Sequence, residues 1–106
     1  LHGGSSIPLA EVERINRAGG QLRQGAKGVS DEAIRQAIGL GICKVNVATD
    51  LRVLWARVYR EHFAAHPDSI EPTVPGWEYM EAIEQFCFEK FKWLGSAGQA
   101  ADFLSR

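Results

Sequence analysis

The chain has 106 residues, 45% of them hydrophobic, and a formal net charge of -1 at pH 7. This length and composition fit a single packed domain. The near-neutral charge argues against nucleic-acid or anionic-membrane partners, which favour basic surfaces, and we find no signal peptide and no run of the roughly 18 apolar residues that a membrane span needs.

The N-terminal part of the chain is predicted to hold a polar loop and two helices. Residues 1–6, LHGGSS, form a glycine- and serine-rich loop of a type that presents backbone N–H groups to an anion. The apolar spacing within residues 7–20 predicts a helix, which a glycine pair ends. A second helix is predicted over residues 29–41, with Ser30 as its N-cap and Gly41 at its C-terminal stop.

The next stretch, ICKVNVAT at residues 42–49, predicts the chain's one strand, because it is rich in β-branched residues and alternates in polarity. Val45 and Val47 share one face, and Lys44 and Asn46 share the other. A polar face on a central strand is costly unless it meets partners or lines a site. One strand cannot form a sheet alone, so we expect it to pair with strands encoded upstream or with a second copy.

Two further helices are predicted after the strand. Thr49 or Asp50 is expected to cap the first, whose apolar positions recur as far as His62 and which Pro67 ends. The second is predicted over residues 77–95, and its aromatic content exceeds one face, so a partner subunit could cover part of it. The predicted apolar stripe of this last helix is Met80, Ile83, Cys87, Phe91 and Leu94.

Two loops, HGGSS and NVATD, follow the positions where neighbouring strands would end. In a (β/α)8 barrel the loops after the last two strands frequently bind phosphate. Gly3 permits a close backbone approach, and Ser5 and Thr49 add hydroxyl donors. Taken alone, a GGS triplet is more often a plain turn.

Three motifs, LHGGSS, GVSDEAIRQAIGLGICKVNVATDLR and FKWLGSAGQA, together resemble the C-terminal part of class II, zinc-dependent ketose-bisphosphate aldolases. Fructose- and tagatose-bisphosphate aldolases are the best-known members. The resemblance implies an α/β fold, the C-terminal portion of a (β/α)8 TIM barrel: the loop after strand seven, helix seven, strand eight, helix eight and a C-terminal helical extension. Residues 1–66 would be the last βα units with an inserted helix, residues 67–106 the extension, and the earlier strands would lie upstream.

The resemblance also implies a zinc cofactor. His2 matches one of the family's three zinc-binding histidines, while the other two and the acidic proton donor would lie upstream. Neutral imidazole suits zinc, and a catalytic site needs about three protein ligands. A monovalent cation could be a second cofactor. His62 and His66 also have metal-compatible i, i+4 spacing, but no third ligand accompanies them.

The substrate-binding positions implied by the resemblance are Gly3, Ser5, Asn46, Ala48, Thr49 and Arg52. Asn46 matches the catalytic asparagine that contacts the enediolate oxygens. Gly3, Ser5 and Thr49 match positions that bind the phosphate of the dihydroxyacetone-phosphate half. Arg52 matches an arginine that reaches the distal phosphate, typically in a neighbouring subunit.

Three residues depart from the family pattern. Ser6 stands where many members have glycine, and Lys90 stands where relatives tend to have arginine. Ala48 replaces the Asp of fructose-type enzymes and is similar to the tagatose-type sequence. Because that Asp would contact a substrate hydroxyl, the sugar preference stays open.

The function expected from the resemblance is aldehyde-lyase chemistry: reversible aldol cleavage of fructose or tagatose 1,6-bisphosphate to dihydroxyacetone phosphate and glyceraldehyde 3-phosphate. Such an enzyme would be a cytoplasmic homodimer or homotetramer of carbohydrate metabolism, in which Cys43 and Cys87 stay reduced. We expect the isolated segment to be inactive and poorly folded. The alternative is a non-catalytic, aldolase-like subunit that binds phosphate or stabilises a partner.

Overall fold

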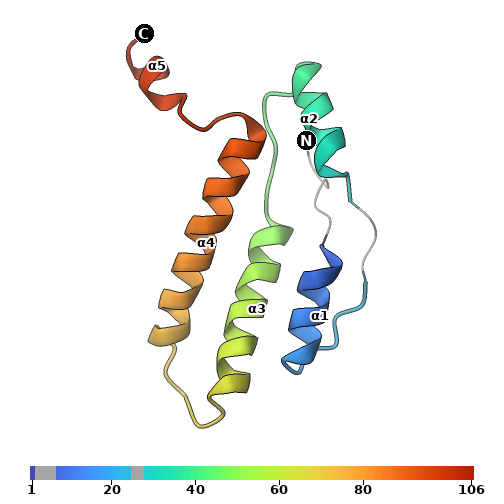
Figure 1. The fold of residues 1–106 in the computed structure, drawn as a ribbon, viewed down its shortest axis with the longest axis vertical. Coiled ribbons are helices and arrows are strands. Elements are labelled where there is room, and N and C mark those ends of the chain that lie inside the picture. The colour runs from blue at the N-terminus through green and yellow to red at the C-terminus, as the bar shows by residue number, and fades with distance from the viewer. Residues whose placement is uncertain (2–6, 25–27) are drawn as a thin grey trace.

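The computed structural model describes residues 1, 7–24 and 28–106 of the chain. Within these residues it contains helices and no strand, and Figure 1 shows α3 lying between α1 and α4. The helices are α1 (Leu9–Arg17), α2 (Asp31–Gly39), α3 (Thr49–Ala65), α4 (Thr73–Leu94) and α5 (Ala100–Leu104). The molecule is thin, with extents of 53 × 34 × 17 Å.

The core forms where α3 packs against α1 on one side and α4 on the other, and α2 also contacts α4. The buried hydrophobic side chains are Val12, Ile15, Ile34, Val53, Leu54 and Val58. On α1, Val12 and Ile15 lie three positions apart, and on α3, Val53 and Leu54 lie five and four positions before Val58, so each helix turns one apolar stripe inward. The apolar spacing predicted for these helices is confirmed at Val12, Ile15, Leu54 and Val58, whereas Leu9 and Trp55 are exposed.

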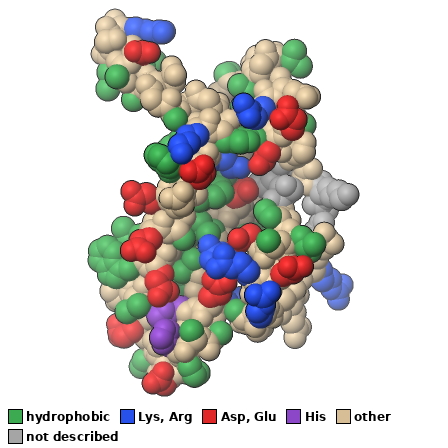
Figure 2. Space-filling view, in the orientation of Figure 1, with side chains coloured by type: hydrophobic (Ala, Val, Ile, Leu, Met, Phe, Trp, Pro, Cys, Tyr) green, Lys and Arg blue, Asp and Glu red, His purple; other side chains and the backbone are tan. Residues whose placement is uncertain are grey.

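The apolar surface of α4 is only partly covered. Trp77 is 63% exposed and Met80 56% exposed, and Phe88 and Phe91 are also exposed. Figure 2 shows hydrophobic side chains interspersed with acidic ones along this helix. One face of α4 packs on α3, but Met80 and Phe91 of the predicted apolar stripe are exposed, so that stripe is only partly covered. None of the described helices combines the length and the apolarity that crossing a membrane requires.

The helix ends follow the local signals of the sequence. Gly19, with φ of +87°, follows α1, and Gly41, with φ of +108°, follows α2. Both conformations suit glycine because it lacks a Cβ. At the start of α2 the Ser30 Oγ accepts a hydrogen bond from the Ala33 N–H at 3.2 Å. These three predictions are confirmed.

Other boundaries were predicted wrongly. The N-cap of α3 is Ala48, not Thr49 or Asp50, and no side chain caps the helix there. Helix α4 begins at Thr73, earlier than predicted, because Pro75 is tolerated in a first turn, where its missing N–H has no intrahelical acceptor. Helix α5 was not predicted as a separate helix, although it lies within residues 67–106, for which the resemblance implies a C-terminal helical extension.

The strand predicted over residues 42–49 is also wrong as a regular element. Residues 42–48 connect α2 to α3 without forming a strand (Figure 1). A strand needs a neighbouring backbone along its length, and apart from the helices that flank this segment, Leu1 is the one described residue that forms backbone hydrogen bonds with it. The expected α/β character is therefore not formed within the described residues.

Candidate functional site

Leu1 lies alongside Val45 in the register of two parallel strands. The Leu1 nitrogen donates to the Lys44 carbonyl at 2.7 Å, and the Asn46 N–H donates to the Leu1 carbonyl at 3.1 Å. In a parallel ladder, one residue hydrogen-bonds to the two residues that flank the residue opposite it. Leu1 makes these bonds to Lys44 and Asn46, which flank Val45. The start of the chain and the segment before α3 therefore run side by side in the same direction.

The residues after this pairing lead into the first turn of α3. Asn46 and Thr49 are half-buried, and Ala48 is exposed. Because Ala48 offers no capping side chain, the first N–H groups of α3 are left for another acceptor. The helix dipole adds partial positive charge at this end, which favours an anion.

Three of the predicted site residues, His2, Gly3 and Ser5, lie outside the described residues, as does Ser6 among the departures. The predictions made for them stay predictions. The structure brings together Asn46 and the start of α3, but it does not test the loop that begins the chain.

Arg52 lies one turn beyond the start of α3 and is exposed. Its side chain lines a hollow on the side of α3 that faces the connection after α1. Arg60 lines the same hollow, two turns further along the helix. Sequence reasoning missed Arg60, although its spacing of eight residues from Arg52, with Ala56 midway, places all three on one helix face.

A network of four charged groups joins α1 to α3. Arg14 donates two hydrogen bonds to Glu61, of 2.6 Å from Nε and 2.7 Å from Nη2. Arg57 donates to Glu61 at 3.1 Å. The Arg57 Nε also lies 2.8 Å from Glu11 Oε2, at an angle outside that of a hydrogen bond, so charge attraction holds that contact.

This network shifts the pKa of two of its members. Burial alone would raise the pKa of Glu61, but the hydrogen bond and charge of Arg14, with a smaller contribution from Arg57, outweigh it and lower that pKa. The hydrogen bond from Glu61 raises the pKa of Arg14, against the opposing effect of burial. The network joins α1 to α3, and Arg57 contacts a carboxylate on each of the two helices.

His62 is a buried polar residue near the end of α3. Its Nδ1 lies 3.2 and 3.0 Å from the two carboxylate oxygens of Glu78 on α4, and its ring lies 4.9 Å from that of His66. Within the described ranges, no group of three or more His, Cys, Asp or Glu side chains could hold a metal ion. The contact joins α3 to α4.

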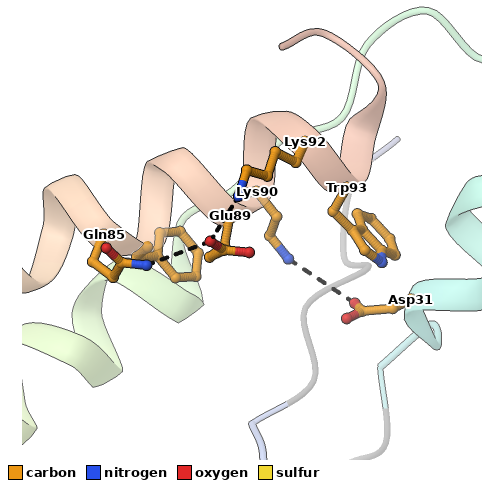
Figure 3. A pocket seen from close by; sticks show the side chains of 7 residues that line it. Asp31, Gln85, Glu89, Lys90, Lys92 and Trp93 are labelled. Carbon is orange, nitrogen blue, oxygen red and sulfur yellow. Dashed lines mark hydrogen bonds and ion pairs between the residues drawn. The ribbon is translucent and has the colours of Figure 1, made fainter.

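A groove of about 540 Å³ lies between α2 and α4. Figure 3 shows Asp31 on α2 reaching towards Lys90 on α4, with the Lys90 Nζ 4.0 Å from the Asp31 Oδ1. The same ammonium lies 5.5 Å from the Phe86 ring centroid and 5.0 Å from that of Trp93. Lys90, one of the departures from the family pattern, is therefore engaged in holding α2 against α4.

Comparison with known families gives one match. The family model for "Fructose-bisphosphate aldolase class-II" matches residues 22–99 of this chain. That range includes α2, α3 and α4 and most of the predicted site, so the match covers well over half of the sequence.

Curated relatives give the same result. The chain is 38% identical to a fructose-bisphosphate aldolase of Giardia intestinalis over 97% of its length, and 36% identical to one of Thermus caldophilus over 94%. It is 33% identical to a fructose-bisphosphate aldolase of Pseudomonas aeruginosa over 95% of its length. These alignments cover only 32%, 32% and 28% of the three relatives, so the chain spans about a third of their length.

Proposed function

Because the chain belongs to the class-II fructose-bisphosphate aldolase family, we propose that it forms the C-terminal part of an enzyme that reversibly cleaves a ketose 1,6-bisphosphate. The products would be dihydroxyacetone phosphate and glyceraldehyde 3-phosphate. In this proposal the chain completes a barrel whose earlier strands lie outside it, and the complete enzyme is a homodimer or homotetramer.

The parallel pairing of Leu1 with the segment around Val45 is the observation that carries the proposal. In a barrel, loops that follow neighbouring parallel strands open onto the same end. The chain continues directly from Leu1 into His2, and from Asn46 towards Thr49. The pairing therefore supports a site shared by the HGGSS and NVATD loops.

The proposed roles follow from the chemistry of each side chain. The Asn46 amide would donate a hydrogen bond to the oxyanion of the enediolate without adding charge. Thr49, in the first turn of α3, would donate its hydroxyl to a phosphate that also accepts from uncapped N–H groups of the helix. Gly3 and Ser5 would complete the same phosphate cradle.

Zinc binding depends on residues beyond those described. The described residues do not assemble a metal site, so the fit to zinc rests on His2 with further ligands outside this chain. When bound, the metal would polarise the substrate carbonyl. The roles proposed for Asn46 and Thr49 concern hydrogen bonding and do not depend on the metal's geometry.

The substrate preference depends on position 48. Ala48 is exposed at the start of α3 and has no polar group to contact a substrate hydroxyl. We therefore propose a weaker preference between the C4 epimers, fructose and tagatose 1,6-bisphosphate, than an enzyme with Asp at this position would have.

A cleavage assay tests the proposal. The full-length protein is assayed against both epimeric bisphosphates, with and without a chelator, and Asn46→Ala is compared with Lys44→Ala, a neighbour on the same face of the segment. We expect chelator-sensitive cleavage, which Asn46→Ala slows by about 10²–10³ in kcat and Lys44→Ala leaves unchanged. Absence of cleavage by the full-length protein would instead favour the non-catalytic subunit.

A further inference from the structure

One side of α4 faces away from the rest of the described chain. Phe86 borders a hollow with Val53 and Leu54 of α3, so the Phe86 side of α4 is turned towards α3. Trp77 precedes Phe86 by nine residues, or about two and a half helical turns, which places it on the opposite side. In the described part of the chain α4 contacts α3 and α2, and α2 meets it at Lys90, so the Trp77 side is left uncovered.

The uncovered side has the spacing at which two helices pair. Positions that are three and four residues apart, in alternation, form a line along the helix: Trp77, Met80, Glu84, Cys87, Phe91 and Leu94. We call this line the α4 seam. It has the a and d spacing of a coiled coil, in which each side chain packs between side chains of a second helix. A hollow of about 510 Å³ lies along its N-terminal half.

Large apolar side chains of the α4 seam are open to water. Met80 is 56% exposed and Phe91 54% exposed, and Phe88, which lies beside the seam, is 56% exposed. At 1.5 Å per residue the seam is about 25 Å long, and Figure 2 shows hydrophobic side chains along α4. Contiguous apolar surface of this kind marks an interaction site. A helix of similar length fits its shape.

The charges beside the α4 seam indicate which helix that is. Glu81 lies near the start of the seam, and Lys92 lies eleven residues later, on the same flank, because eleven residues are close to three whole turns. About 16 Å separates the two along the axis, so they do not pair within one copy. When two copies of α4 run antiparallel, these flanks face each other, and Glu81 of each copy comes close to Lys92 of the other. The charges therefore favour a second copy of this helix.

The acidic residue within the seam favours the same direction. In a parallel pair Glu84 would face Glu84 of the other copy, and the two like charges would repel. In an antiparallel pair with Trp77 opposite Leu94, Glu84 instead lies opposite Cys87 of the other copy. A single polar residue in such a seam commonly sets the register of the two helices.

We propose that α4 pairs antiparallel with α4 of a second copy of this chain through the α4 seam. The inference deepens the proposed function, from which it takes only the expectation that the complete protein is an oligomer. Because the seam lies on the side of α4 away from Phe86, the pairing leaves the contact between α3 and α4 as it is.

A measurement of association tests the seam. The full-length protein is studied by sedimentation equilibrium, comparing Met80→Asp with Gln36→Asp, which adds the same charge at an exposed position on α2. We expect Met80→Asp to raise the Kd for association about tenfold or more and Gln36→Asp to leave it unchanged, with the same helical circular dichroism in both. A monomeric parent, or association that Met80→Asp leaves intact, would overturn the proposal and assign the seam to another segment of the chain or to a different protein.

A charge exchange tests the partner and its direction while leaving the apolar side chains in place. Glu81→Lys alone and Lys92→Glu alone each bring like charges together, so we expect each to raise the Kd about tenfold. The double variant restores opposite charges and should recover most of the lost affinity. Because Lys92 also contacts Glu89 in its own copy, the recovery is measured against Lys92→Glu alone. A double variant that associates no better than Lys92→Glu would overturn antiparallel pairing of two copies.

Both measurements are independent of cleavage. If the full-length protein associates through the α4 seam but cleaves no bisphosphate, the proposed function fails and the inference stands. If the protein cleaves the bisphosphate and Met80→Asp leaves its association unchanged, the inference fails and the proposed function stands.

Discussion

The buried imidazole of His62 contacts the carboxylate of Glu78, with 3.0 Å between Nδ1 and Oε2. His62 is 6% exposed and sits in the last turn of α3, while Glu78 belongs to the second turn of α4. A polar group at that depth is costly unless it is bonded. This contact therefore gives a bonded partner to His62, the one buried polar side chain of the described core. It also joins α3 to α4, the two longest helices.

Removing the carboxylate should loosen the junction between α3 and α4. We expect Glu78→Ala to lower the free energy of unfolding by about 1–2 kcal/mol, because His62 then loses its bonded partner in the core. Glu81→Ala, an exposed neighbour on the same helix, is the matched control and should change it by less than about 0.5 kcal/mol. Urea denaturation of the full-length protein gives both values, and equal midpoints would contradict the role of the contact.

The ion-pair network between α1 and α3 should make stability depend on pH. The pKa of Glu61 is lower in the folded chain than its ordinary value of 4.5. The stability that Glu61 adds to the folded state is therefore fully present at pH values above 4.5. As the pH falls below it, the unfolded state takes up a proton before the folded state does, and the contribution is lost. We expect Glu61→Gln to remove this part of the acid sensitivity.

Denaturation at several values from about pH 7 to about pH 3 measures the effect. Glu13→Gln, on the exposed side of α1, is the control and should keep the acid sensitivity of the parent. Because Glu61 is about one-third exposed, we expect a difference of no more than about 1 kcal/mol at neutral pH. Parallel curves for parent and Glu61→Gln would show that the network adds nothing.

Local signals explain why the helices were largely predictable. The Ser30 cap and the glycines after α1 and α2 act within a few residues of the helix ends, so the sequence contains the whole interaction. The strand at residues 42–49 was not predictable in the same way. Its hydrogen bonds belong to a neighbouring backbone, and in the described residues that neighbour is Leu1 alone.

In the candidate site, too, the residues with local sequence signals were predictable and those that depend on contacts between elements were not. Asn46 and Thr49 were found from the polar face of the segment before a predicted helix, from the hydroxyl at the helix start and from the resemblance, and the structure places both beside the start of α3. Arg60 was missed because a charged residue on a helix is usually solvated, and only the wall formed by Gln21 and Leu22 shows that it borders a hollow. Such a wall depends on contacts between elements, which single-helix patterns do not contain.

Gly20 should be intolerant of any side chain. A Cβ at this position would lie 2.5 Å from the Ile15 Cγ2 and 2.7 Å from the Ile15 carbonyl oxygen, so Gly20→Ala must displace the end of α1. We expect a loss of about 1–3 kcal/mol in the free energy of unfolding. Gly39→Ala is the matched control, because a Cβ there meets nothing within 4 Å, and it should be neutral or stabilising by up to about 1 kcal/mol. A neutral Gly20→Ala would mean that the connection after α1 is looser than its hydrogen bonds indicate.

Position 48 should affect both the start of α3 and the choice of sugar. Ala48 is the N-cap and makes no side-chain bond, so Ala48→Asp should stabilise the helix by about 0.5–1 kcal/mol, through a bond to a first-turn N–H and through the dipole. If the same carboxylate also meets a substrate hydroxyl, it should change the ratio of kcat/KM for the two C4-epimeric bisphosphates by about tenfold, or roughly 1–2 kcal/mol.

Ala48→Ser separates the two effects, because a hydroxyl can cap the helix without adding a carboxylate. Thermal denaturation reports the cap, and the ratio of kcat/KM for the two sugars reports the substrate contact. If Ala48→Asp is more stable than the parent but keeps the parent's ratio of kcat/KM for the two sugars, residue 48 acts on the helix alone. In that case the preference between the two epimers is set by a residue other than residue 48.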